Sequence, residues 1–222
     1  MPPPSAIQGG GSVQQGLSAA YESIAFCKHR RAADKRYSLG LRMTLRVRSE
    51  LLAIKPVDAA EREHLSDAID WVDSGAPLFR TAKPAVPAKH LVSYFAVVDN
   101  GHILLVDHKN AQLWLPTGGH VEPDEDPRET VVRELKEELG LEIAVDKVGP
   151  PQMVTVTETV GLTSGHTDVS LWYAISGSRS AKLEFDPSEF NEARWFRYSE
   201  VPLARSDPHL GRFLAKLSAT EA

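Results

Sequence analysis

Three glutamates near the middle of the 222-residue chain have the spacing of a cation-binding group. Glu134, Glu137 and Glu138 stand at i, i+3 and i+4, so on a helix they share one face. Like charges at this spacing repel and destabilise a helix by roughly a few tenths of a kcal/mol. Mg²⁺, which binds carboxylate and phosphate oxygens, would turn that repulsion into attraction. The alternative interpretation is a solvated acidic face without a ligand.

The segment around these glutamates carries its own signals for the start and the end of a helix. Asp126 is a favourable N-cap, Pro127 suits the first helical position, and Glu129 can close a capping box. Gly140 can take the left-handed conformation that ends a helix, with Leu141 beyond it as a hydrophobic contact. We therefore predict a helix between Asp126 and Gly140. Its apolar side is formed by Val131, Val132, Leu135 and Leu139.

The spacing of the whole stretch 119–141 favours the cation. It resembles the Nudix box, Gly-x5-Glu-x7-Arg-Glu-U-x-Glu-Glu-x-Gly-U, in which U is a bulky aliphatic residue, and every position fits. At average residue frequencies near 7%, chance agreement is about one in a billion per starting point. The motif needs a strand, a glycine-containing loop and a helix around it, and the sequence supplies them. The matching residues are Gly119, Glu125, Arg133, Glu134, Leu135, Glu137, Glu138, Gly140 and Leu141.

The resemblance covers about residues 90–205 and implies both a fold and a reaction. The implied fold class is α/β, the Nudix α/β/α sandwich with a mixed sheet. The implied reaction is hydrolysis of a pyrophosphate bond in a nucleoside diphosphate derivative, in which water attacks phosphorus with the help of Mg²⁺, or Mn²⁺ as a substitute. Phosphoryl transfer asks the protein for positioning and charge neutralisation, which agrees with a carboxylate cluster.

Roles for single residues also follow from the resemblance. Glu137 and Glu138 are expected to be metal ligands. Glu134 is expected to be either a further ligand or the general base. The carbonyl of Gly119 is expected to be a backbone ligand. Arg133 is expected to hold the carboxylates in place, with a surface salt bridge of little value as the alternative.

Further carboxylates are candidates at the edge of the motif and beyond it. Glu125 is expected to orient the site or to bind the metal weakly. Glu189 is the candidate for an additional metal ligand, because it stands six residues before Trp195, a spacing similar to that in MutT-type members. Glu192 is its rival, and an ordinary loop acid is the alternative for each.

Other side chains are candidates for substrate contacts. His166 and Asp168 precede a predicted strand and are expected to face the substrate, with a strand-edge polar cluster as an equal alternative. His120 is a further polar candidate. Trp114 and Phe95 could stack on a base, although aromatic residues in strands usually belong to the core.

Positions outside the box leave the substrate open. The proline of ADP-ribose-type members and the tyrosine of dinucleoside-polyphosphate members are missing from the region 156–159. The MutT-type nucleoside triphosphate class remains as the default, with nucleotide sugars beside it. One alternative is a catalytically silent, nucleotide-binding or regulatory domain, which would tend to lose box glutamates. Another is an isopentenyl-diphosphate-isomerase-like enzyme, which would want a cysteine in the domain, whereas the single cysteine is Cys27.

Composition limits the partners and the location. Hydrophobic residues make up 42% and charged residues 25% of the chain, as in soluble globular proteins. The net charge of −5 gives no overall basic footprint for nucleic acid. No apolar run approaches the roughly 18 residues of a membrane span. We expect a nucleotide as the ligand, a cytoplasmic location, and no stable nucleic-acid or membrane partner, and we leave a homodimer open.

Four parts are predicted along the chain: a disordered segment 1–36, a helical hairpin 37–76, a linker 77–89 and a Nudix hydrolase domain 90–222. The hairpin helices should span about 38–54 and 58–75, and we expect their apolar stripe to dock on the Nudix domain or on a second subunit. A polar loop is predicted at 161–165 and a closing helix at 208–217. Strands are predicted at 91–98, 103–106, 113–115, 143–148, 153–159, 169–175 and 193–198.

Overall fold

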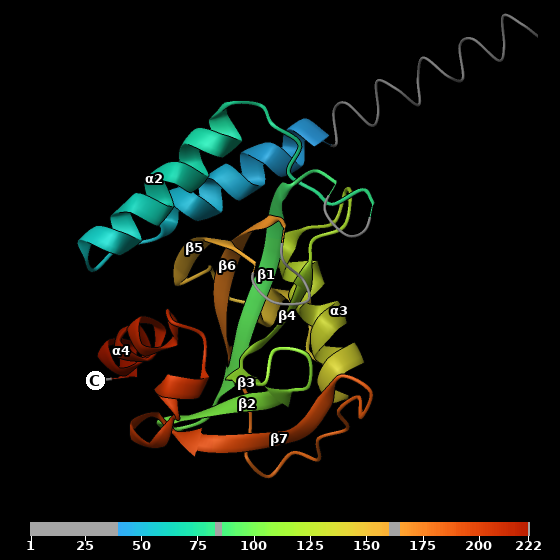
Figure 1. Ribbon diagram of the computed structural model, residues 1–222, viewed down its shortest axis with the longest axis vertical. Helices are drawn as coiled ribbons and strands as arrows, with labels where there is room; N and C mark the ends of the chain where they lie inside the picture. The colour runs from blue at the N-terminus through green and yellow to red at the C-terminus, as the bar shows by residue number, and fades with distance from the viewer. Residues whose placement is uncertain (1–39, 83–85, 160–164, 222) are drawn as a thin grey trace, which may run out of the picture. The chain divides into compact units, whose positions relative to one another are not determined.

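The computed structural model describes residues 40–82, 86–159 and 165–221 (Figure 1). Residues from Met43 onward form one compact unit, which contains the sheet and the helices that cover it. The predicted disorder of 1–36, Cys27 and most of the predicted loop 161–165 lie outside the described residues.

A seven-stranded mixed sheet forms the centre of this unit. The strand order is β3-β2-β1-β6-β5, and β4 and β7 pair with β1 and β2. The pair β1 and β6 is parallel, and the other pairs are antiparallel. The strands are β1 (Lys89–Val98), β2 (His102–His108), β3 (Leu113–Leu115), β4 (Thr117–His120), β5 (Met153–Glu158), β6 (Thr167–Ser176) and β7 (Phe190–Arg197).

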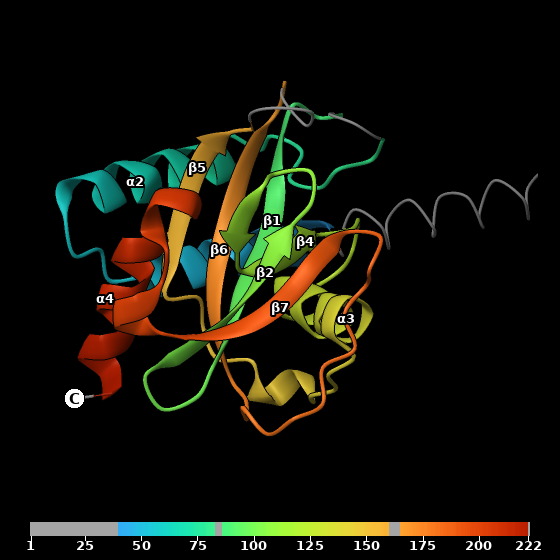
Figure 2. The same cartoon turned by 60° about the horizontal axis from the view of Figure 1, so that its bottom comes forward.

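Helices cover both faces of the sheet. The helices α3 (Pro127–Leu139) and α4 (Leu210–Glu221) lie on opposite sides of it (Figure 2). The alternation of side chains along β1 explains this, because successive residues of a strand point to opposite faces. Phe95 and Val97 pack in the core that includes α3, whereas Ala96 packs in the core that includes α4. The predicted α/β/α sandwich with a mixed sheet is confirmed.

Two helices before the sheet confirm the predicted hairpin: one over residues 40–53 and α2 (Ala59–Asp73). The side chain of Asp58 caps α2 by accepting a hydrogen bond from the Glu61 amide at 2.8 Å. From Met43 onward the hairpin shares the core of α3, so it contributes to the unit rather than standing apart from it. Its fully buried apolar residues are Val47, Leu51, Ala68 and Val72. The division into domains stays a prediction.

Polar contacts reinforce this packing. Arg128 of α3 donates to the buried carboxylate of Glu50 at 2.7 Å and 3.0 Å. The edge strand β5 is joined to α2, because the amide of Val156 donates to Nδ1 of His64 at 3.1 Å. An unpaired edge strand exposes its backbone groups, so this side chain satisfies one of them.

The helix α3 confirms the capping signals of the sequence. Asp126 accepts from the amide of Arg128 at 2.9 Å, and Glu129 accepts from the amide of Asp126 at 3.2 Å, which completes the capping box. Gly140 has a φ of 66°, and the amide of Leu141 donates to the Leu135 carbonyl at 3.2 Å. All these contacts are local, which is why the sequence alone could place both ends of the helix.

Two expectations about the secondary structure are wrong. The predicted strand 143–148 is instead a short 3-10 helix, η1 (Val145–Lys147), flanked by extended chain. The carbonyl of Val148 accepts from Arg128 of α3 at 3.1 Å rather than from a neighbouring strand. Conversely, Thr117, Gly118 and Gly119, expected in a loop, form β4 against β1. Glycine has little intrinsic preference for strands, so only the partner strand decides this pairing.

The remaining elements agree with the sequence within a few residues. The closing helix begins at Leu210 and extends beyond the predicted end. The last strand, β7, begins at Phe190, before the predicted start. Short 3-10 turns, η3 (Tyr198–Glu200) and η4 (Leu203–Arg205), connect β7 to α4. Among the described residues, no helix combines the length and the apolar composition that crossing a membrane requires.

Candidate active site

The strand β4 brings two glycines against the carboxylates of α3. The register of β4 on β1 pairs Tyr94 with Gly118 and Ser93 with Gly119. The amide of Gly118 donates to Oε2 of Glu138 at 3.3 Å. A Cβ atom built on Gly119 would lie 2.7 Å from Cγ of Glu134 and would overlap its carboxylate. Glycine is therefore required at 119 for Glu134 to lie against the strand.

Arg133 connects the carboxylates of the cluster. Its guanidinium holds Glu125 in a bidentate pair, with Nε to Oε1 at 2.9 Å and Nη2 to Oε2 at 3.0 Å. Nη1 donates to Oε1 of Glu134 at 2.5 Å and lies 3.5 Å from Oε2 of Glu137. Nη2 also donates to the carbonyl of His120 at 3.2 Å. Through these contacts the guanidinium links α3 to β4 and to the loop between β4 and α3, which an isolated surface salt bridge would not do.

The environments of the carboxylates differ in their effect on protonation. Burial is the main cause that raises the pKa of Glu138 to about 9, and the charges of Glu134 and Glu189 add to it. Burial also raises the pKa of Glu134, in spite of Arg133. Burial is the largest single influence on Glu125 too, but hydrogen bonds from Arg133 and Thr130 outweigh it and lower the pKa of Glu125. For Glu134 and Glu138, the contacts with Arg133 and with the Gly118 amide do not outweigh the effect of burial.

A divalent cation fits this donor set. The ionised forms of Glu134 and Glu138 are disfavoured by burial and by the charges of neighbouring carboxylates, and a bound cation would reverse both effects. Glu137 is 60% exposed and can turn toward an ion from the same helix face. Hard oxygen donors of this type suit Mg²⁺ or Mn²⁺.

The two candidate ligands outside the box differ in their surroundings. Glu189 acts electrostatically on Glu138, which places it near the cluster. Glu192 is instead paired with Arg194 on β7 through contacts of 2.8 Å and 2.6 Å. The placement favours Glu189 over Glu192, and its role as a ligand stays a prediction.

A cavity of about 470 Å³ opens beside Glu138, Gly118 and Gly119. Of the residues expected to contact substrate, His120 and Asp168 line it, whereas His166 is buried behind its wall. Trp114 and Phe95 belong to the two cores. The cavity is lined further by apolar side chains, among them Val92, Leu113, Leu115 and Phe190.

Several lining residues carry no signal in the sequence. Tyr94, His108 and Asp207 come from β1, β2 and the turn before α4, and no local motif connects them. Burial raises the pKa of Asp207. His90 is also unexpected: it is fully buried at the start of β1, beside His120, His166 and Asp168.

The fold and the site together define a class of protein: an α/β/α sandwich in which one helix sets acidic side chains against a glycine-containing strand beside a cavity. The model of the Nudix domain family matches residues 89–217, and the chain belongs to this family.

Individual relatives match different parts of the chain. It is 44% identical over 55 residues to the CTP pyrophosphohydrolase of Escherichia coli (strain K12), a match covering 22% of this chain and 41% of that protein. It is 29% identical over 164 residues to the m7GpppN-mRNA hydrolase NUDT17 of Danio rerio, a match covering 55% of this chain and 52% of that protein. The chain thus spans about half the length of the curated relatives it matches. Among solved structures, the E. coli ORF135 protein shares 28% identity at a TM-score of 0.48, over 60% of this chain and 91% of that chain.

Proposed function

We propose that this protein is a metal-dependent hydrolase that cleaves a pyrophosphate bond in a nucleoside diphosphate derivative through attack of water on phosphorus. One observation carries the proposal: Glu138 of α3 lines a cavity of ligand size, and Arg133 holds Glu125 and Glu134 together beside it. Ligand cavities typically measure about 300 to 1,000 Å³, so a nucleotide fits the 470 Å³ present here.

The residues that would hold Mg²⁺ or Mn²⁺ are Glu134, Glu137, Glu138 and the carbonyl of Gly119, with Glu189 as a further donor. When bound, the cation supplies neutralisation of phosphate charge and a more acidic water. Arg133 acts on the site by fixing Oε1 of Glu134, which leaves the other carboxylate oxygen of Glu134 for a ligand bond or for a proton. Both roles of Glu134, ligand and general base, remain part of the proposal.

The substrate class we favour is a nucleoside triphosphate, with nucleotide sugars as the second group. The relatedness to a CTP pyrophosphohydrolase supports the first group. His120 and Asp168 stand in the cavity wall where they would contact such a ligand, and Nε2 of His166 lies 3.4 Å from Oδ1 of Asp168. The same proposal includes a cytoplasmic location and no stable nucleic-acid or membrane partner. It leaves a homodimer open.

With a triphosphate we expect the monophosphate and pyrophosphate as products. No Gly-x4-Gly-Lys-Ser/Thr motif occurs in the chain to direct attack to the terminal phosphate. Turnover in ¹⁸O-water, followed by mass spectrometry, identifies the phosphorus that takes the new oxygen. Labelled orthophosphate as the first product, without added pyrophosphatase, would contradict this choice of bond.

The activity itself is tested by a screen of nucleoside triphosphates and nucleotide sugars with Mg²⁺, using wild type, Glu138→Gln and a control, Glu142→Gln. Among the described residues, Glu142 is exposed and forms an ion pair with the exposed Lys136, so its loss should leave the rate unchanged. We expect Glu138→Gln to abolish turnover while the protein stays folded. A Glu138→Gln variant with a tenth of the wild-type rate, or nucleotide binding without any turnover in wild type, would refute the proposal. The second outcome would support a silent binding domain.

A further inference from the structure

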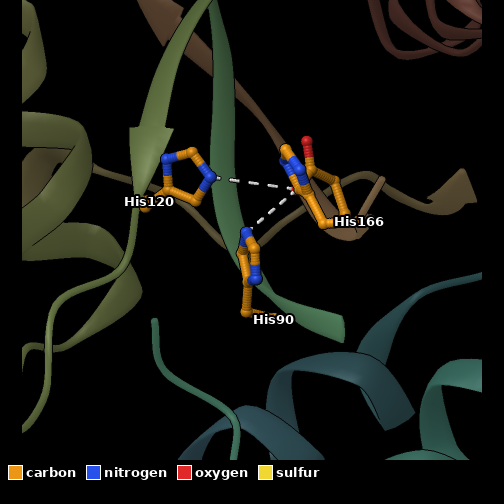
Figure 3. A group of neighbouring side chains, drawn as sticks. His90, His120 and His166 are labelled. Carbon is orange, nitrogen blue, oxygen red and sulfur yellow. Dashed lines mark ion pairs between the residues drawn. The ribbon is translucent and has the colours of Figure 1, made fainter. Parts of the chain in front are cut away.

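Four side chains from separate parts of the chain meet where β1 and β6 begin and β4 ends. His90 and Asp168 are register partners in the parallel pair β1 and β6, so they project from the same face. His120 ends β4 beside β1, and His166 directly precedes β6. Figure 3 shows the three rings close together, with the ion-pair lines of His90 and His120 meeting beside His166. One ligand atom from each of the four residues lies within 4.8 Å of the others.

The distances suit a small tetrahedral ion. The distance from Nε2 to Oδ1 of Asp168 is 3.3 Å for His90, 3.4 Å for His166 and 3.9 Å for His120. With metal–nitrogen and metal–oxygen bonds of roughly 2.0 Å, neighbouring ligands of a tetrahedral zinc ion stand about 3.3 Å apart. The distances of His90 and His166 to Oδ1 are already close to this value, whereas the ring of His120 must approach. The separations between the ring nitrogen atoms are all within 4.8 Å.

The outer nitrogen atoms of two rings are held as in metal-bound histidines. Nδ1 of His90 donates to the carbonyl of Pro87 at 2.8 Å, so the neutral ring keeps a lone pair on Nε2. Nδ1 of His166 lies 3.2 Å from the hydroxyl of Thr159, which itself donates to the carbonyl of His166. The hydroxyl oxygen therefore accepts from Nδ1, and Nε2 of His166 also keeps its lone pair. Such second contacts orient histidines toward a metal.

The inward atoms lack compensation. His90 is fully buried, and within the described residues neither its Nε2 nor Oδ1 of Asp168 has a hydrogen-bond partner. A lone pair of a neutral ring and a carboxylate oxygen that face each other in a buried place are both acceptors, so they need a cation or a proton between them.

We propose that His90, His120, His166 and Asp168 form a binding site for a divalent transition-metal ion, best matched by Zn²⁺, separate from the box carboxylates. Imidazole nitrogen suits Zn²⁺, whereas the all-oxygen cluster of α3 suits Mg²⁺, so the two sites select different ions. The ion would join β1, β4 and β6 and fix the cavity wall at His120 and Asp168. Binding of this ion does not depend on the proposed hydrolysis.

The positive charge of Arg80 makes it possible to test whether the cluster binds a cation or an anion. Its Nη1 donates to Nε2 of His120 at 3.3 Å, the atom that the metal would use. A cation in the cluster displaces this contact and is repelled by the guanidinium. An anion, such as a phosphate group bound by protonated histidines, would instead gain from Arg80. Replacement of Arg80 therefore strengthens binding of a cation and weakens binding of an anion.

The direct experiment uses the full chain, stripped with a chelator and dialysed into excess Mg²⁺ to occupy the oxygen site. Zn²⁺ is titrated by calorimetry, and Co²⁺ is followed by visible absorption. We expect one tight Zn²⁺ per chain and the strong Co²⁺ bands of a four-coordinate site. At a Zn²⁺ concentration a hundredfold above Kd, Tm should rise by roughly 5 to 10 °C. His166→Asn and His90→Gln should lose these signals, and the control His102→Gln, on the surface of β2, should keep them.

Two results would overturn the proposal. One is the absence of stoichiometric Zn²⁺ binding by the wild type, and the other is Zn²⁺ binding and Co²⁺ bands that persist in both cluster variants. Because a cluster variant that fails to fold would lose binding for a trivial reason, Arg80→Met provides the second test. Tighter Zn²⁺ binding by Arg80→Met supports the metal site. If Arg80→Met instead binds Zn²⁺ equally or more weakly and also binds inorganic phosphate more weakly, the cluster is a site for anions and the metal-site proposal is refuted.

Discussion

The carboxylate of Glu134 occupies the space that a side chain at Gly119 would need. The strand β4 and the helix α3 therefore approach each other closely at a point where the strand has no room for a side chain. Arg133 holds the acid in this position, with Nη1 at 2.5 Å from Oε1 of Glu134.

The first prediction follows from this contact. In Gly119→Ala the new methyl group overlaps the end of a flexible side chain, so Glu134 must turn away while the backbone stays in place. We expect a small change in Tm and a fall in kcat of about a hundredfold, the scale of a displacement of about 1 Å in a catalytic group. The control is Gly149→Ala, where a Cβ has no heavy atom within 4 Å. Equal rates in the two variants would contradict the role of Glu134.

The second prediction concerns the hydrogen bonds of the Arg133 guanidinium with Glu125 and Glu134. Arg133→Lys keeps the charge but cannot bind Glu125 through two atoms and Glu134 through a third. We expect a loss of roughly 10- to 100-fold in kcat, as for other residues that orient metal ligands, with a weaker apparent affinity for Mg²⁺. Arg194→Lys, which alters an exposed pair with Glu192, is the matched control and should behave as wild type.

The third prediction is a pH dependence of the metal-free protein. The pKa of Glu138 is about 9 in the folded protein, above its ordinary value of 4.5, so the folded state keeps a proton that the unfolded state releases. Stability contributed by Glu138 should therefore be complete below about pH 4.5 and fall as the pH rises toward 9.

Thermal unfolding in a chelator between pH 5 and 9 tests this dependence. Between pH 5 and 9 the Tm of wild type should fall further than the Tm of Glu138→Gln, because the glutamine has no proton to release. Added Mg²⁺ should raise the Tm of wild type more at pH 8 than at pH 5, because the cation binds the ionised carboxylate. Parallel curves for the two proteins would show that Glu138 is not protonated in the folded state.

The fourth prediction concerns the hairpin. Leu51 is fully buried in the core of α3, whereas its neighbour Leu52 is 56% exposed. Leu51→Ala should lower the free energy of unfolding by about 2 to 5 kcal/mol, and Leu52→Ala by less than about 1 kcal/mol. Urea unfolding, followed by tryptophan fluorescence and circular dichroism, measures both. Because the hairpin shares this core, Leu51→Ala should shift a single transition, and a separate early transition would show an independent hairpin.

The helix α3 and its caps could be predicted because every contact that defines them lies within a few residues along the chain. The same holds for the start of α2 at Asp58 and for most strands, where alternation of apolar residues is itself the signal. The box carboxylates belong to this group, since helical periodicity alone sets Glu134, Glu137 and Glu138 on one face.

Contacts between distant segments could not be predicted. The run 143–148 has apolar residues that would suit a strand, but a strand needs a free edge, and the carbonyl of Val148 is bound by Arg128 instead. Gly118 and Gly119 have little preference for a strand, and yet pairing with β1 makes them one. Hydrogen bonding between strands depends on what lies alongside, which no local pattern contains.

The sequence by itself determined the capped helix, the order of the acidic side chains on it and the family they indicate, because periodicity and capping act over one or two turns. Only the tertiary structure decided that Glu134 rests on Gly119, that the hairpin enters the core, and that His90, His120, His166 and Asp168 meet. The last group comes from β1, β4, β6 and the residue before β6. The parallel register of β1 and β6 sets His90 beside Asp168 across 78 positions of the chain. Register is a property of paired strands, so it exists only in the folded sheet.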